Sequence, residues 1–375
     1  MTQLTQRWIW QQPDWPQFTW DPQVIGAPLA AARLAQGKTL GAGRLLDRDL
    51  TLEAALAVLV EDGVTTSAIE GERLDIDAVR SSVARQLGLP TAGLPPPPRA
   101  VEGLVDVLWD ATQSFDTPLT EARLFAWQTA LFRGGQSVLQ PIRTGTLRGE
   151  APMHVVSGPI GHERIHFTAP PNVGLNAELD RFVGWFNAPP SGLDGLIRAG
   201  LAHLWFVTLH PFEDGNGRLA RALTDRAMAQ DERQALRLFS LSAQILRERD
   251  AYYAILEQTQ RGGLDVTAWL HWFLRQVAAA AGAAEQTIAR TLAKARFWLR
   301  HQTTDINARQ RKVLNRLLDA GAAGFEGGMN TRKYVSLTRA SRATAYRELT
   351  DLVAKGCLQP TGAGGRSASY VLTQA

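Results

Sequence analysis

Apolar residues recur every three or four positions along most of the chain, which is the spacing of an amphipathic helix. Residues 29–88 show this pattern, and we expect one of their helices at Asp75–Leu87. Pro90 and the run Pro95–Pro98 then interrupt the pattern and predict a stiff linker. Residues 1–28 are rich in Trp and Pro, which predicts an extended arm whose rings pack against a neighbouring surface.

The pattern stays helical from about residue 99 to residue 298, with one interruption. Between Met153 and Phe167, two short β-prone runs flank the turn sequence Ser157-Gly-Pro-Ile-Gly161, which predicts a β-hairpin. We therefore expect a mainly α-helical bundle with a small hairpin, followed by a long helix that ends near His301. The predicted helices are Arg99–Gln113, Leu119–Phe132, Asn176–Phe186, Leu193–Leu209, Arg218–Gln230, Ser242–Gln260 and Thr267–Ala280.

Residues 299–375 differ in character from the rest of the chain. Three predicted helices precede a strand, a Gly-rich turn at residues 362–365 and a second strand, the order of a winged helix-turn-helix. No helix follows the Gly-rich turn, so we interpret it as the wing and not as a phosphate-binding loop. Basic residues outnumber acidic ones here, and three roles stay open: DNA binding, protein docking and an ordinary solvated face. The predicted helices are Ala308–Leu318, Thr331–Leu337 and Ser341–Lys355.

Composition narrows the class of protein. The 375 residues are 45% apolar and 20% charged, which is ordinary for a soluble globular chain of two or three domains. No apolar run reaches the ~20 residues of a membrane helix, and the first residues lack the pattern of a signal peptide. Cys357 is the single cysteine, which excludes an intramolecular disulfide. We expect a cytoplasmic protein with no membrane partner; the net charge of +4 does not by itself indicate nucleic acid.

The candidate catalytic and binding residues lie where the predicted apolar helix that ends at Leu209 is followed by a polar loop. His210-Pro211 ends this helix, because proline disfavours helical backbone at the residue before it. The following loop, residues 213–217, contains two glycines, which accept positive φ angles, and a new helix begins near Arg218. A Gly-rich loop at a helix N-terminus presents free backbone N–H groups and a positive dipole end, so this segment predicts an anion site.

The side chains around this loop extend the prediction to a nucleotide. Arg218 and Arg221 lie on one helical face and are suited to phosphate oxygens. Asp214 beside phosphates is favourable when a cation such as Mg²⁺ lies between them. His210 can accept a hydroxyl proton near neutral pH. A single histidine would more often be a capping residue, but the whole group predicts a magnesium–nucleotide site with a histidine base.

The string His210-Pro-Phe-Glu-Asp-Gly-Asn-Gly-Arg-Leu-Ala-Arg221 resembles the Fic family motif, His-x-Phe-x-Asp/Glu-Gly-Asn-Gly-Arg-x-x-Arg, at every fixed position. The resemblance implies transfer of AMP from ATP to a Tyr, Thr or Ser hydroxyl of a protein, with Mg²⁺ as cofactor. It implies that Phe212 anchors the core and that the Met153–Phe167 hairpin is the flap that aligns the target by strand addition. The implied roles are His210 as general base, Asp214 for Mg²⁺, and Gly215, Asn216, Gly217, Arg218 and Arg221 for the phosphates.

A second resemblance concerns regulation. Thr66-Ser-Ala-Ile-Glu-Gly71 matches the family's inhibitory signature, Ser/Thr-x-x-x-Glu-Gly/Asn. It implies an N-terminal inhibitory helix whose Glu70 pairs with Arg221 and keeps the γ-phosphate from its productive position. A carboxylate that neutralises Arg221 also repels the phosphate that needs this arginine.

The expected domains are an N-terminal region at residues 1–98 with the inhibitory helix, a Fic core at 99–298 and the winged helix at 299–375. Self-modification and a homodimer through the aromatic arm are further expectations. Three alternatives stay open: removal of AMP from a modified protein, use of another phosphate donor, and a DNA-binding regulator with a Fic body.

Overall fold

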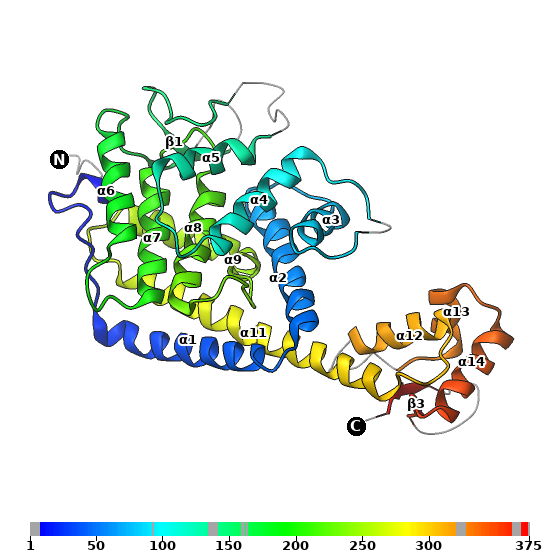
Figure 1. The fold of residues 1–375 in the computed structure, drawn as a ribbon. Coiled ribbons are helices and arrows are strands. Elements are labelled where there is room, and N and C mark those ends of the chain that lie inside the picture. The colour runs from blue at the N-terminus through cyan, green and yellow to red at the C-terminus, as the bar shows by residue number, and fades with distance from the viewer. Residues whose placement is uncertain are drawn as a thin grey trace. The chain divides into compact units, whose positions relative to one another are not determined.

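The computed structural model describes residues 8–91, 94–133, 142–158, 162, 164–319, 328–361 and 369–373. The chain is mostly helical, as predicted (Figure 1). It forms two compact units: residues 1–43 with 51–284, and residues 44–50 with 285–375. The predicted division at residues 98 and 298 stays a prediction. No helix in the described part of the chain is long and apolar enough to cross a membrane.

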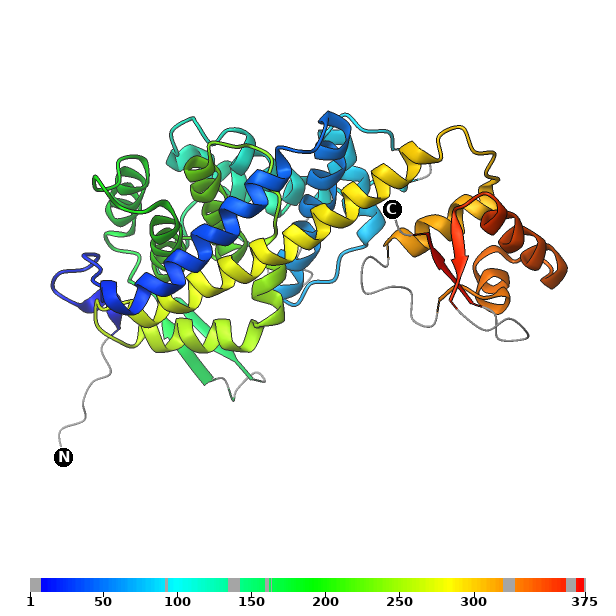
Figure 2. The ribbon, with the colours of Figure 1, turned by 90° about the horizontal axis from the view of Figure 1, so that it is seen from below.

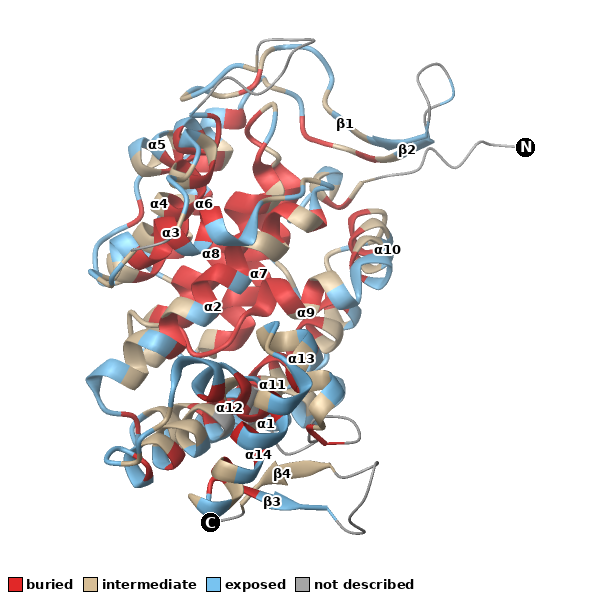
Figure 3. Cartoon of the chain, turned by 90° about the vertical axis from the view of Figure 1, so that its right-hand side faces the viewer, coloured by how far each residue is buried: buried red, intermediate tan, exposed pale blue. Residues whose placement is uncertain are grey.

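The first unit is built around two buried helices, α7 and α8, which pack against each other at its centre (Figure 3). Every residue of α7 from Leu196 to Leu209 is buried, as expected for a helix that is apolar all round. The Asp194 side chain caps α7 by accepting hydrogen bonds from two backbone N–H groups of its first turn. The elements are η1 (Ile9–Gln11), α1 (Pro22–Gly43), α2 (Arg48–Ile69), α3 (Ile76–Gln86), α4 (Arg99–Gln113), α5 (Glu121–Leu131), α6 (Leu175–Asn187), α7 (Gly195–Leu209), α8 (Asn216–Glu232), α9 (Leu241–Arg247), α10 (Arg249–Gln260) and α11 (Thr267–Arg300).

The predicted hairpin is present as strands β1 (His154–Ser157) and β2 (Arg164–Thr168), which pair antiparallel with a bulge between Val155 and Val156. On another face of the unit, α1 runs beside α11 (Figure 2), and the Thr39 hydroxyl donates to the Ala281 carbonyl at 2.8 Å.

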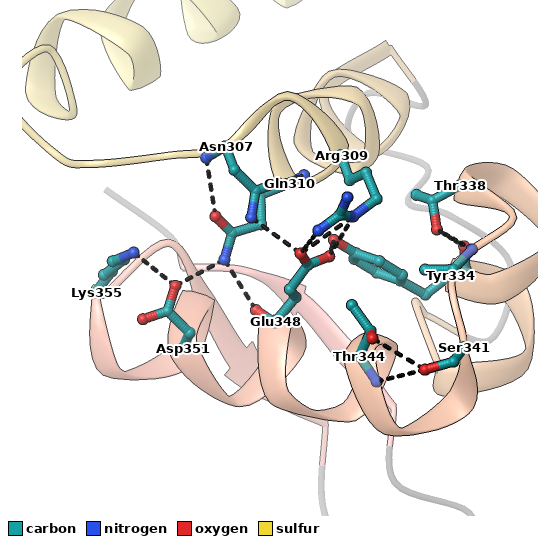
Figure 4. A network of polar contacts seen from close by, with 11 residues as sticks. Asn307, Arg309, Gln310, Tyr334, Thr338, Ser341, Thr344, Glu348, Asp351 and Lys355 are labelled. Carbon is teal, nitrogen blue, oxygen red and sulfur yellow. Dashed lines mark hydrogen bonds and ion pairs between the residues drawn. The ribbon is translucent and has the colours of Figure 1, made fainter.

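The second unit has its own hydrophobic core and a polar network. The Glu348 carboxylate receives hydrogen bonds from Asn307, Arg309 and Tyr334 (Figure 4). Burial and this carboxylate both raise the pKa of the Tyr334 hydroxyl. The elements are α12 (Ala308–Asp319), α13 (Thr331–Thr338), α14 (Arg342–Ala354) and the antiparallel strands β3 (Leu358–Pro360) and β4 (Tyr370–Leu372). This order matches the expectation, although the winged-helix assignment stays a prediction and the proposed wing at 362–365 lies outside the described residues.

Two expectations about helix boundaries are wrong. The predicted extended arm ends early, because α1 begins at Pro22; the Asp21 carboxylate accepts from the Gln23 N–H at 2.8 Å, and proline suits the first helical position. The helix predicted at residues 242–260 is two helices that break at Glu248.

The aromatic rings of the arm pack on their own chain. Trp15 contacts Trp205 edge-on at 6.2 Å between ring centroids, and the Trp10 indole donates to the Thr168 carbonyl at 2.8 Å. These rings therefore do not supply the argument for a homodimer that their sequence suggested.

The close crossing of α4 and α5 gives a stability test. A Cβ added to Gly103 would lie 1.8 Å from the Ala130 carbonyl oxygen, so we expect Gly103→Ala to lower the free energy of unfolding by about 2 kcal/mol or more. Gly37→Ala in α1 is the matched control, because nothing lies within 4 Å of its added Cβ and alanine favours helix. Urea denaturation of both variants measures the difference. Equal stabilities would show that the two helices separate at little cost.

Candidate functional site

His210 lies at the C-terminal end of α7, in the left-handed region at φ 49° and ψ 56°. Its N–H still donates to the Phe206 carbonyl at 3.0 Å, while Pro211 prevents the helix from continuing. The buried Arg148 guanidinium donates to the His210 carbonyl at 2.8 Å and to the Pro170 carbonyl. The position of the histidine is therefore fixed by its own backbone and by a side chain from a preceding loop.

The protonation state of His210 follows from its surroundings. The pKa of its imidazole is lowered to about 4, mainly by burial and also by the charge of Arg148, while the hydrogen bond to Val207 and the charges of Glu70 and Asp214 act in the opposite direction. Nδ1 lies 3.3 Å from the Val207 carbonyl oxygen, which can only accept, so the hydrogen of the neutral ring belongs on Nδ1. Nε2 is then left as an acceptor, the form that a general base requires.

The loop after His210 is closed by the side chain of Asn216. Its amide accepts from the Phe212 N–H at 3.0 Å and donates to the Phe212 carbonyl at 2.8 Å, while the Phe212 ring is fully buried. Gly215 adopts φ 86°, where a side chain would be strained. The loop therefore leads directly into α8, whose first backbone N–H groups have no helical partner and can bind an anion.

Two buried arginines follow in the first turns of α8. The side chains of Arg218 and Arg221 are 6% and 2% exposed. The Arg218 guanidinium lies 5.3 Å from the centroid of the Phe132 ring. Within the described part of the chain, Arg218 Nε and Arg221 Nη1 are buried donors without a hydrogen-bond partner. Such donors are costly to bury unless a ligand or water satisfies them.

The end of α2 brings carboxylates to both arginines. Glu70 Oε1 lies 2.7 Å from Arg221 Nη2, and Thr66 accepts from the same guanidinium through its hydroxyl at 2.7 Å and its carbonyl at 3.0 Å. Glu72 Oε2 lies 3.0 Å from Arg218 Nη1. A Cβ added to Gly217 would lie 2.2 Å from Glu70 Oε1, so this carboxylate sits directly against the start of α8.

A glycine turn makes this arrangement possible. Gly71 has φ 86°, its N–H donates to the Ala68 carbonyl, and the Glu72 N–H donates to the Ser67 carbonyl. This is the pattern of a Schellman motif, in which a left-handed residue ends the helix and reverses the chain. The carbonyl of Ile69, the last residue of α2, accepts hydrogen bonds from the Arg249 side chain at 2.8 Å and from the Tyr253 hydroxyl at 3.2 Å.

Some of these groups border a cavity of about 700 Å³, a size typical of small-molecule sites. Its lining includes Glu70, His210 and Gly217, residues of both hairpin strands, and one side of α10. The Glu257 carboxylate of α10 bonds two side chains of β2: its Oε1 lies 3.0 Å from Arg164 Nη2, and its Oε2 lies 2.6 Å from His166 Nδ1.

Asp214 is the candidate ligand for Mg²⁺. Its side chain is 52% exposed, and its Oδ1 lies 3.7 Å from Arg218 Nη2. No group of three His, Cys, Asp or Glu side chains able to hold a metal occurs among the described residues. This donor set fits Mg²⁺ only when a ligand's phosphate oxygens and water complete its coordination, which is the usual arrangement for Mg²⁺ with a nucleotide.

The structure thus brings together all the site residues that the sequence predicted. It also adds residues that sequence reasoning missed: Arg148 behind His210, Glu72 on Arg218, and Arg249 and Tyr253 at the end of α2. No local pattern marks them, because each acts across a long separation in the chain. His203 is a buried packing residue whose two ring nitrogens lie 2.9 Å from the hydroxyl oxygens of Thr224 and Tyr252.

Comparison with known proteins decides the family. Residues 118–228 match the Fic/DOC family, and residues 8–89 match a domain of unknown function, DUF4172. The chain contains a Fic/DOC family domain. A protein adenylyltransferase Fic from Culex quinquefasciatus is 48% identical over 56 residues, which cover 14% of this chain and 11% of that protein. The chain therefore matches only a small part of this curated relative.

Solved structures share the fold of the Fic domain. A Fic family protein from Desulfovibrio desulfuricans G20 superimposes with a TM-score of 0.53 at 18% identity, covering 96% of this chain and 98% of that one. A Fic domain-containing signaling protein from Bacteroides thetaiotaomicron VPI-5482 does so with a TM-score of 0.53 at 16% identity, covering 70% and 97%. At these identities the likeness concerns the fold alone.

The protonation of His210 can be measured directly. We expect its imidazole, followed by NMR on histidine-labelled protein, to titrate near pH 4, because burial disfavours the charged form. His210→Asn assigns the signal. Since an unfolded histidine titrates near 6.5, this residue should also contribute stability that is complete above pH 6.5 and is lost as the pH falls toward 4. A midpoint near 6.5 would show that the ring is solvated.

Proposed function

We propose that the protein transfers AMP from Mg-ATP to a Tyr, Thr or Ser hydroxyl of a protein. The observation that carries this proposal is that His210 and the start of α8 line one cavity, and that two buried arginines follow in the first turns of the same helix. Fixed guanidinium groups at a helix N-terminus bind phosphate oxygens bidentately. The partial relative named protein adenylyltransferase supports AMP as the transferred group.

The proposed chemistry needs one proton acceptor and a phosphate cradle. Nε2 of neutral His210 accepts the proton of the target hydroxyl. The hydroxyl oxygen then forms a bond to the α-phosphorus, the bond between this phosphorus and the oxygen that bridges to the β-phosphorus breaks, and pyrophosphate leaves. Asn216 and Gly217 offer backbone N–H groups, Gly215 would do so once its N–H leaves the Asp214 carboxylate, and Arg218 and Arg221 would hold the departing phosphates. Mg²⁺ held by Asp214 would supply positive charge beside these phosphates.

The hairpin would align the target segment by strand addition. The Thr168 carbonyl of β2 already accepts from Trp10, and the Ile165 and His166 carbonyls accept from Arg261. Because these acceptors of β2 are occupied, β1 is the strand whose edge suits an added segment. Val156 of β1 is 48% exposed there and offers an apolar contact.

Glu70 would act as an internal inhibitor. Its carboxylate lies against Gly217 and on Arg221, where a phosphate anion would have to be placed. Two like charges cannot share this site, so productive ATP binding requires Glu70 to leave. The wild-type chain is therefore expected to show little self-modification.

The inhibition is tested by Glu70→Gly. We expect AMP incorporation from α-labelled ATP and Mg²⁺, into the protein itself or an added extract, to rise by about 100-fold or more, because the variant frees the buried Arg221 for the phosphate; a 100-fold change corresponds to about 2.7 kcal/mol. Intact-mass analysis checks that the adduct is AMP. Glu61→Gly places the same change on an exposed part of α2 and should leave incorporation low.

Two further variants make this test specific. Adding His210→Ala should abolish transfer while nucleotide still binds, and adding Arg221→Ala should make it slow again. An unchanged rate in folded Glu70→Gly would refute the inhibition, and AMP removal would be favoured if this variant also failed to release AMP from a modified protein.

A second function, duplex DNA binding by the C-terminal unit, is favoured by the surface of α14. Arg342, Tyr346 and Arg347 are exposed at helical spacing near its start. The acids of α14 are already engaged: Glu348 with Arg309, and Asp351 with Lys355. We propose that this basic face contacts DNA phosphates and the major groove.

DNA binding should depend steeply on salt through counterion release. We expect Arg347→Ala to weaken binding of the full chain to a random duplex and to reduce the slope of log affinity against log salt by about 1. Arg73→Ala, an exposed arginine of the first unit, serves as the control. No binding at low salt, measured by fluorescence anisotropy, would favour protein docking.

A further inference from the structure

Glu72 directly follows the inhibitory signature, which ends at Gly71, so the signature gives this residue no role. Its carboxylate is 3.0 Å from Arg218, while Glu70 holds Arg221. Both carboxylates come from the single turn that ends α2, and the left-handed Gly71 directs Glu72 back toward α8. Each arginine of the phosphate cradle therefore has its own acidic partner.

The two ion pairs differ in strength. Arg221 is held by Glu70 and twice by Thr66, so its guanidinium stays ordered when one partner leaves. Among the described residues, Arg218 has only carboxylates as polar partners, Glu72 at 3.0 Å and Asp214 at 3.7 Å, and each arginine keeps one buried donor without a partner. The two carboxylates are about equally accessible to water, at 34% exposed for Glu72 and 31% for Glu70, so the difference between the pairs lies in the two Thr66 hydrogen bonds that only Arg221 receives. Exchange of a carboxylate for a phosphate is therefore easier at Arg218 than at Arg221.

We propose that Glu72 is a second internal carboxylate that competes with nucleotide phosphate for Arg218 and so sets nucleotide affinity, separately from Glu70. This inference rests on the proposed function, since it takes the ligand to be a nucleotide polyphosphate. The start of α8 attracts one anionic group, and both Glu72 and a phosphate oxygen satisfy Arg218 through the same N–H donors. Binding of the nucleotide must displace the carboxylate.

The test measures binding and not turnover. The probe is α,β-methylene-ATP with Mg²⁺, whose α–β linkage cannot be cleaved by transfer, and its Kd is measured by calorimetry on the full chain. We expect Glu72→Gln to tighten binding about three- to tenfold, because it removes a partly solvated competing charge. Glu61→Gln, an exposed glutamate of α2, should bind as the wild type does. Adenosine, which carries no phosphate, should bind equally to all three proteins.

A double-variant cycle shows whether the effect passes through Arg218. In an Arg218→Ala background, Glu72→Gln should change the Kd by less than about twofold, because the competition no longer exists. An equal gain in both backgrounds would overturn the proposal and indicate a general charge effect. An unchanged Kd in folded Glu72→Gln, checked by thermal denaturation, would also overturn it.

Failure of the proposed function gives a different result. If α,β-methylene-ATP binds to none of the proteins while inorganic pyrophosphate binds and responds to Glu72→Gln, the competition stands and adenine nucleotide is not the ligand. If neither probe binds to any variant, the cradle is not a phosphate site and both proposals fall.

Discussion

The burial of two guanidinium groups at the start of α8 is the constraint on which the rest of the site depends. A buried charge is strongly unfavourable unless an opposite charge and hydrogen bonds compensate it. Arg218 pairs with Glu72 and Arg221 pairs with Glu70, and both of these carboxylates come from the end of α2. The structure shows the two arginines neutralised by the protein's own acids, and under the proposed function a bound anion would take the place of these acids.

This constraint makes the N-terminal segment part of the site. The match to the Fic/DOC family begins at residue 118, yet both compensating carboxylates lie before it, within the segment that matches a separate domain. α10 then connects the end of α2 to the hairpin. Its Arg249 and Tyr253 hold the Ile69 carbonyl, and one turn later Glu257 holds β2 through Arg164 and His166. A displacement of α10 would thus reach both the turn that carries the proposed inhibitory Glu70 and the hairpin that we propose aligns the target.

Local physics made much of this arrangement predictable from sequence. Apolar periodicity located most helices, and proline after His210 gave the end of α7. The start of α1 was missed although Asp21-Pro22 is a standard capping pattern, because the Trp-rich composition suggested an extended arm. The break at Glu248 carries no Gly or Pro signal. The residues around the site that were missed, such as Arg148 and Glu72, act through pairings between distant segments, and a single sequence contains no periodicity that reports them.

The Gly71 turn also explains why the inhibitory signature requires Gly or Asn after its glutamate. These two residues are the ones that most readily adopt the left-handed conformation that ends α2, and a Cβ at Gly71 would meet no neighbouring atom, so the requirement is conformational and not steric. Without this turn, α2 would continue past Glu70 and the next carboxylate would point away from α8. Because these carboxylates and the phosphate of the proposed ligand would satisfy the same guanidinium donors, release of the carboxylates and binding of that ligand would be thermodynamically linked. Any partner that stabilises α2 in its present position must weaken ligand binding, and the ligand must weaken that partner by the same factor.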